Sequence, residues 1–233
     1  MYGYIKEMGV QRGTRAVVLV QRERLCYSKK NVYQQLRRET QRKTEVYMHC
    51  GRKNNKRNLA AMKKDNIVLI GMPGVGKSTA GVILAKVLGY EFVDADLVIQ
   101  KEEGKLLKEI IEEVGTDGFI AVENRVNSSL EVDHSIIATG GSVVYGKEAM
   151  EHLKSIGTVV YLQLPFEELN RRLSDIKGRG VVLKDGQTLK DLYEERVPLY
   201  EKYADITVNE YGLNVEQTID KILSLRNEKK CKK

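Results

Sequence analysis

The stretch Gly71-Met-Pro-Gly-Val-Gly-Lys-Ser78 fits the phosphate-loop pattern G-x-x-x-x-G-K-[ST] at every position. It follows an apolar run at 67–70 and precedes a helix-like segment that begins at Thr79. The chemistry needs this order, because glycines let backbone N–H groups turn toward phosphate oxygens and the following helix adds the positive end of its dipole. The pattern therefore predicts a site for a nucleoside triphosphate.

Two side chains of this loop have distinct tasks. Lys77 can reach the β- and γ-phosphates of the nucleotide, and the Ser78 hydroxyl can ligate Mg²⁺. We expect the rest of the nucleotide-contacting set to consist of Gly74, Val75, Gly76 and Thr79.

Strand-like and helix-like segments alternate on both sides of the loop. We predict strands near 67–71, 90–94, 135–139, 158–163 and 205–209. We predict helices at 77–88, 96–102, 106–113, 118–131, 146–155, 166–174, 188–202 and 214–227. This alternation favours an α/β fold with a parallel sheet covered on both faces.

Charge divides the chain of 233 residues into two parts. Residues 1–61 hold 15 Lys and Arg against 4 Asp and Glu, whereas the remainder holds 24 basic and 28 acidic residues. The overall charge of +7 therefore describes the N-terminal part, and we expect no nucleic-acid partner. We interpret 1–61 as a basic extension, flexible or mis-annotated, and expect the folded domain to be 62–233, because Met62 leads straight into the first strand.

The cysteines and the lengths of the uncharged runs indicate where in the cell the protein is expected to be found. Cys26, Cys50 and Cys231 are far apart and lack metal-ligand spacing, so we expect free thiols in a reducing cytoplasm. Uncharged runs such as 135–146 are shorter than the ~18 residues that cross a membrane, so we expect no membrane association, and we expect a monomer.

Two carboxylates, Asp94 and Asp96, close the second predicted strand. Ligands of open α/β sheets bind at the carboxyl edge, where both side chains can face. One carboxylate beside a phosphate loop can hold Mg²⁺, and the other can accept a hydrogen bond from a substrate hydroxyl. A pair of solvated loop carboxylates is the alternative.

Three further features are weaker signals. Gly140 and Gly141 end a buried strand and permit close backbone approach, either by a ligand or for packing. Arg179 lies in a polar, glycine-containing segment that we predict to be a mobile lid over phosphate. Arg196 precedes a proline late in a helix; its planar fork suits a carboxylate substrate, or it pairs on the surface with neighbouring glutamates.

The chain resembles the shikimate kinase family from about Asn66 to Leu225, and not in residues 1–61. The phosphate loop is generic; the likeness depends on the ordered set GMPGVGKST, FVDADLVI, IIATGGSVV, Arg179 and ERVPLYEKYAD. The resemblance implies a nucleoside-monophosphate-kinase-like fold with five parallel strands in order 2-3-1-4-5. It also implies transfer of the γ-phosphate of ATP to a hydroxyl of shikimate, with Mg²⁺, in aromatic amino-acid biosynthesis.

On the donor side, the resemblance implies that Lys77 and Ser78 serve ATP and Mg²⁺ and that Asp94 assists the metal. Arg172 falls where the family stacks an arginine against adenine, and Arg179 would hold phosphate from the lid.

On the acceptor side, the resemblance implies that Asp96 holds the reacting hydroxyl and acts as base. Gly140 and Gly141 would line the pocket for this small hydroxy acid, and Arg196 would bind its carboxylate.

The sequence departs from the family pattern Gly-Glu-x-x-Phe-Arg-x-x-Glu, in which the arginine is a second contact to the substrate carboxylate. Phe119 and Glu123 keep the register here, so Ile120 replaces that arginine. Arg125 points elsewhere on a helix, whereas Asn124 shares the face of Ile120 and is expected to offer a neutral hydrogen bond. Loss of the arginine is expected to weaken carboxylate binding by on the order of 2–3 kcal/mol.

This departure keeps two other functions open. One is a paralogous kinase that acts on another polyol or hydroxy acid, for which Ile120 is the main evidence. The other is a nucleotide-binding regulator without turnover, against which Asp94, Asp96 and Arg179 argue. The family's second adenine-side arginine is not evident around 209–211 either.

Overall fold

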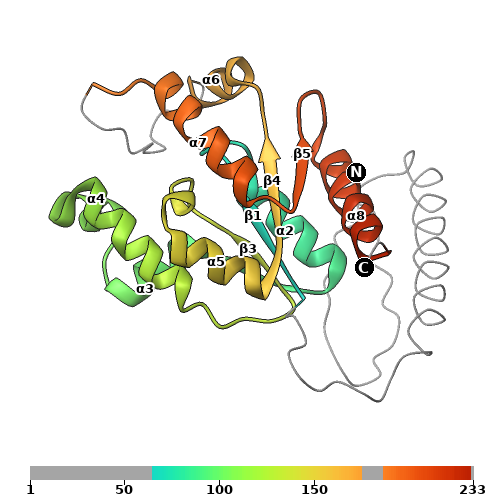
Figure 1. Cartoon of the computed structure of the whole chain (residues 1–233), viewed down its shortest axis with the longest axis horizontal. Helices are drawn as coiled ribbons and strands as arrows, with labels where there is room; N and C mark the ends of the chain where they lie inside the picture. The colour runs from blue at the N-terminus through green and yellow to red at the C-terminus, as the bar shows by residue number, and fades with distance from the viewer. Residues whose placement is uncertain (1–64, 175–185, 232–233) are drawn as a thin grey trace, which may run out of the picture. The chain divides into compact units, whose positions relative to one another are not determined.

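The computed structural model describes residues 65–174 and 186–231, and its centre is a parallel sheet of five strands (Figure 1). The strands are β1 (Asn66–Ile70), β2 (Glu91–Asp94), β3 (Ser135–Ala138), β4 (Gly157–Gln163) and β5 (Ile206–Asn209). Their order is β2-β3-β1-β4-β5, which confirms the predicted topology.

Strand β1 lies at the middle of the sheet and is buried along its whole length. Ile67 pairs with Ile136 of β3 on one side and with Thr158 of β4 on the other. A parallel strand covered on both faces needs a continuous apolar run, and the sequence supplies one at 67–70.

The helices follow the predicted alternation with the strands. They are α2 (Lys77–Leu88), α3 (Ala95–Glu103), α4 (Leu107–Ser128), α5 (Lys147–Ile156), α6 (Phe166–Ser174), α7 (Leu189–Tyr203) and α8 (Val215–Cys231), with a 3₁₀ turn at Val143–Tyr145.

The helices cover the sheet in layers (Figure 1). Helix α2 contacts β1, β2 and β3, and α8 lies beside it against β5. Helix α5 covers β1 and β4 on the other face, and α4 packs on α5. Parallel strands with connecting helices leave one edge of the sheet, at the carboxyl ends of the strands, open for ligands.

Helix α4 contains the break that the sequence predicts between 106–113 and 118–131. Gly115 has φ 71° and ψ 179°, which is not helical, so the backbone changes direction inside α4. The second part of α4 begins beyond this break and places Glu123 beside Gly140, which follows β3.

Arg226 ties the last helix to the start of the first strand. Its guanidinium donates to Asp65 at 2.5 Å and to the Tyr90 hydroxyl at 3.2 Å, and the residue is only 6% exposed. This contact joins residues 161 positions apart.

Two predictions fall on residues that the structure does not describe. The extension 1–61 and the lid segment with Arg179 lie outside the described ranges, so both stay predictions. Within 65–174 and 186–231, no helix is both long and apolar enough to cross a membrane.

Candidate active site

The phosphate loop leads from the carboxyl end of β1 into α2, as predicted. Lys77 is the first residue of α2 and is buried, and its ammonium donates to the carbonyl oxygens of Gly71 at 2.8 Å and Met72 at 3.0 Å. Burial lowers the pKa of Lys77 to about 8, and the negative charge of Asp96 opposes that effect. The Lys77 ammonium is thus bound to carbonyl oxygens of its own loop, from which it can turn to an incoming phosphate.

The predicted metal ligands, Ser78 and Asp94, lie side by side. The Ser78 hydroxyl donates to Asp94 Oδ2 at 3.4 Å, although the residues are 16 positions apart. A hydroxyl and a carboxylate oxygen are hard ligands of the kind that Mg²⁺ prefers, together with substrate phosphates and waters. The pair therefore fits a magnesium ion beside the loop.

Asp94 and Asp96 take different positions although only one residue separates them. Asp94 is the N-cap of α3, where its Oδ1 accepts from the backbone N–H of Asp96 at 3.0 Å. Asp96 lies in the first turn of α3. Burial and the charge of Asp94 raise the pKa of Asp96, and Lys77 opposes the rise.

Gly140 and Gly141 allow the carboxyl end of β3 to approach the other site residues closely. A β-carbon at Gly140 would overlap Glu123 Oε1 and lie 3.1 Å from Asp96 Oδ1. A β-carbon at Gly141 would lie 2.8 Å from Pro73 and 3.1 Å from a guanidinium nitrogen of Arg196. The lack of side chains at Gly140 and Gly141 therefore lets neighbouring site residues pack directly against the backbone.

Arg196 does not pair on the surface with Glu194 or Glu201, which excludes one of the two interpretations of this residue. It is 4% exposed, its Nε donates to the Tyr145 hydroxyl at 3.2 Å, and its guanidinium lies over the Tyr145 ring. Within the described ranges it makes no ion pair with a carboxylate. A buried guanidinium in this state is suited to an anionic ligand.

Glu123 is a second buried ionisable residue, and it lies beside Gly140. It is 1% exposed, and neither carboxyl oxygen accepts a hydrogen bond of good geometry from the residues described, although the Ser142 hydroxyl is near enough to lower its pKa somewhat. Burial dominates and raises the pKa of Glu123 to about 7. Ile120 precedes it by one helical turn and is half-buried.

The expectation that Asn124 replaces the missing arginine is wrong. Its amide donates to Glu148 at 2.9 Å, and its carbonyl oxygen accepts from the backbone N–H of Ala149 at 2.9 Å. The side chain thus ties α4 to α5, and both its oxygen and its nitrogen are engaged there. Arg125 pairs with Glu102 and Glu103 and points elsewhere, as predicted.

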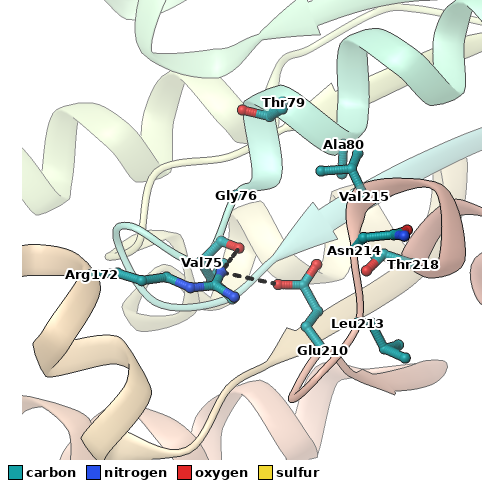
Figure 2. A pocket seen from close by; sticks show the side chains of 10 residues that line it. All are labelled: Val75, Gly76, Thr79, Ala80, Arg172, Glu210, Leu213, Asn214, Val215 and Thr218. Carbon is teal, nitrogen blue, oxygen red and sulfur yellow. Dashed lines mark hydrogen bonds and ion pairs between the residues drawn. The ribbon is translucent and has the colours of Figure 1, made fainter.

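A cavity of about 360 Å³ lies beside the phosphate loop (Figure 2). Its lining residues are Val75, Gly76, Thr79, Ala80, Arg172, Glu210, Leu213, Asn214, Val215 and Thr218. Arg172 donates to the Val75 carbonyl at 3.4 Å, which holds the α6 side chain against the loop. A cavity of this size that shares residues with a phosphate loop suits the base and ribose of a nucleotide.

Sequence reasoning missed Glu210 as a site residue and used Glu123 only to fix a register. Glu210 is 6% exposed, and burial raises its pKa to about 7. Both glutamates look like ordinary surface charges in the sequence. Only the order of the strands, which brings distant segments together, places them in the site.

Comparison with known proteins gives consistent results. The profile of the shikimate kinase family matches residues 73–226. A shikimate kinase of Persephonella marina is 37% identical over 159 residues, which cover 68% of this chain and 96% of that protein. A shikimate kinase of Clostridium botulinum strain 657 is 42% identical over 151 residues, which cover 62% of this chain and 88% of that protein.

Solved structures agree with this result. The shikimate kinase of Acinetobacter baumannii in complex with shikimate superposes with a TM-score of 0.63 at 34% identity, covering 72% of this chain and 95% of the other. The Aquifex aeolicus shikimate kinase has a TM-score of 0.56 at 35% identity and covers 70% of this chain and 97% of its own.

Proposed function

The chain belongs to the shikimate kinase family, and on that premise we propose how its residues transfer the γ-phosphate of ATP to a hydroxyl of shikimate. One observation carries the proposal. The buried Arg196, which lacks a carboxylate partner among the described residues, lies against Gly141 at the same sheet edge as Lys77 and Asp96. A buried cation that suits an acidic substrate, Arg196, therefore lies close to Lys77, which binds phosphate in this proposal.

On the donor side, Lys77 leaves the carbonyl oxygens of Gly71 and Met72 and binds the β- and γ-phosphates. Ser78 and Asp94 would hold Mg²⁺, which neutralises charge on the phosphate oxygens when it is bound. The base and ribose occupy the cavity between Arg172 and the start of α8.

On the acceptor side, Arg196 binds the carboxylate of shikimate, and Asp96 accepts a hydrogen bond from the reacting hydroxyl. That oxygen attacks the γ-phosphorus in line, the bond from phosphorus to the bridging oxygen of ADP breaks, and Asp96 takes the hydroxyl proton. A carboxylate with a raised pKa is a stronger base, so burial of Asp96 favours this role. Arg179 stays a proposed phosphate contact.

The direct test is ADP release by the full-length protein with ATP and Mg²⁺, with and without shikimate. We expect shikimate-dependent ADP release and one phosphorylated hydroxyl in the product. ADP release that shikimate does not stimulate, from protein that still binds ATP, would contradict the assigned acceptor.

Lys77→Met tests the donor side. The methionine side chain has similar length but no charge, so it fills the buried site and cannot neutralise phosphate. We expect kcat to fall by at least about 10³-fold, because the charge acts on the transition state, with an unchanged circular-dichroism spectrum. Residual activity above a few percent would refute the assignment of the phosphate loop.

The same assay should also be run with a polyol or another hydroxy acid as the acceptor. The family's second arginine for the substrate carboxylate is absent, because Ile120 stands at its position. A paralogous kinase for a polyol or another hydroxy acid would show a higher kcat/KM with that acceptor than with shikimate.

We further propose that the protein acts as a cytoplasmic monomer without nucleic acid. The excess of acidic over basic residues after residue 61 supports the last point. Light scattering with and without duplex DNA tests the monomeric state and the lack of DNA binding, and a dimer mass or a DNA-dependent rise in mass would contradict the one or the other.

A further inference from the structure

Glu210 sits on a rigid support at the wall of the nucleotide cavity. It directly follows β5, its backbone N–H donates to the Gln163 carbonyl at 2.9 Å, and its own carbonyl accepts from Leu213 at 3.0 Å. Both main-chain groups are therefore fixed by neighbours. The carboxyl group points into the cavity, toward Arg172 (Figure 2).

The carboxyl group of Glu210 is buried but poorly satisfied. Its side chain is 7% exposed, and its only ion pair with a described residue is with Arg172 Nη1 at 4.0 Å, the outer limit for such a pair. Around it the cavity wall is largely apolar, with Val75, Leu213 and Val215. A buried carboxyl group in such a wall is costly unless a ligand supplies hydrogen bonds.

The nucleotide base that enters this cavity has the matching groups. Adenine presents an amino donor next to a ring-nitrogen acceptor, and a carboxamide pairs with both groups. A carboxylate can accept from the amino group only, whereas a protonated carboxyl group offers one acceptor and one donor, as a carboxamide does.

We propose that Glu210 is the residue that selects adenine, by accepting a hydrogen bond from its exocyclic amino group. This inference rests on the proposed function, because that function places the base of ATP in the cavity. It adds a specificity-determining residue that lies away from the reacting phosphate.

The protonation of Glu210 adds a second, pH-dependent contact. Burial raises the pKa of Glu210 to about 7, against the positive charges of Arg172 on α6 and Lys77 on α2; the lining residues from α8 and its preceding loop, Asn214 and Thr218 among them, are uncharged. Below that pH the protonated group also donates to the ring nitrogen of adenine. ATP affinity is therefore expected to rise as the pH falls from 8.5 to 6.

Calorimetric titration of the full-length protein, without shikimate, tests this proposal directly. The ligands are ATP and purine riboside triphosphate, which lacks the amino group, at pH 6 and 8.5. For the unmodified protein we expect ATP to bind about tenfold more tightly than the analogue at both pH values, because either form of Glu210 accepts from the amino group. Both ligands should bind more tightly at pH 6 than at pH 8.5, because both carry the ring nitrogen that accepts from protonated Glu210.

Two variants of Glu210 distinguish recognition of the adenine amino group from a purely structural role of this residue. Glu210→Ala is expected to weaken ATP binding about tenfold and to leave the analogue within about threefold, which removes the preference. Glu210→Gln carries an acceptor and a donor at every pH, so it should keep the preference, and the affinity for either ligand should no longer depend on the protonation of residue 210. Glu216→Gln, an exposed carboxylate in the first turn of α8, controls for the loss of charge and should change nothing.

Equal weakening of ATP and the analogue in Glu210→Ala would overturn the proposal, since it would show that Glu210 only positions Arg172. An unchanged preference in that variant would overturn it as well. Neither result depends on the acceptor, so failure here is distinct from a failure of shikimate to stimulate ADP release.

Discussion

The carboxyl group of Glu123 lies unsatisfied beside Gly140 because of the residue one turn before it. In the family pattern an arginine stands there, and residues three apart on a helix are neighbours, so its guanidinium would reach the glutamate. Ile120 removes that cation. One substitution thus explains a buried carboxyl group with a pKa near 7, and it leaves Arg196 as the one described cation that we propose for the substrate carboxylate.

Ile120→Arg should restore the missing contact. The new guanidinium can bind the shikimate carboxylate and pair with Glu123, so we expect the KM for shikimate to fall by about tenfold or more with little change in the KM for ATP. Steady-state kinetics with each substrate varied in turn measures this.

Ile120→Gln is the matched control for that variant, because it has a polar side chain of intermediate length without charge. It should leave the KM for shikimate near its original value. If Ile120→Arg behaves like this control, either the register or the acceptor is wrong.

Glu123→Gln should change how stability depends on pH. The folded protein keeps a proton on Glu123 up to about pH 7, whereas the unfolded chain releases it near pH 4.5. Stability therefore falls as the pH rises from 4.5 to 7 and stays lower above, by on the order of 3 kcal/mol from this group. Glutamine has no such proton, so the Tm of the variant relative to the unmodified protein should rise between pH 5 and pH 8.

Thermal unfolding at both pH values, without ligands, measures this difference. Glu112→Gln, a change of an exposed carboxylate on the same helix, should show no such trend. A constant difference in Tm for Glu123→Gln would mean that Glu123 is ionised throughout.

At the scale of helices and strands, the sequence was informative because each apolar run alternates with an amphipathic segment. All five strands begin and end within one residue of the predicted ranges. The two helices predicted at 106–113 and 118–131 form one element with a break at Gly115, and the 3₁₀ turn at Val143–Tyr145 was not predicted. Short turns carry too little periodicity to be read from sequence.

The break in α4 requires glycine. Gly115 combines φ 71° with ψ 179°, a region that side chains essentially exclude, and a β-carbon there would meet no other atom within 4 Å. Gly115→Ala should therefore destabilise the fold by about 3 kcal/mol through the backbone alone.

Gly104→Ala is the comparison for that variant. Gly104 ends α3 at φ 67° and ψ 18°, a left-handed conformation that alanine reaches at about 1 kcal/mol, and it also has open space around it. Urea unfolding of both variants gives the two free energies. Equal losses would show that the backbone of α4 can readjust around residue 115.

At the scale of the whole molecule, the strand order assembles the site. Because β1 lies between β3 and β4, Pro73 of the phosphate loop after β1 meets Gly141 after β3. The motifs predicted these two contributions. They could not predict Glu210, because it reaches the cavity only through the position of β5 at the edge of the sheet and has no motif of its own.

Residues 62–233 alone are expected to retain kcat and both KM values within about twofold, because every described site residue lies inside this range. The measurement compares purified full-length protein with the shorter chain. A loss of stability or activity in the shorter chain would show that residues 1–61 contribute to the enzyme.

The contact of Arg226 with Asp65 has a consequence for synthesis on the ribosome. The start of β1 emerges early, yet its partner on α8 is made 161 residues later, and the part of the cavity wall from Leu213 to Thr218 also belongs to the last stretch. The nascent chain therefore cannot close its nucleotide cavity until translation is nearly complete. ATP can therefore contact the phosphate loop and this wall together only in the nearly finished protein.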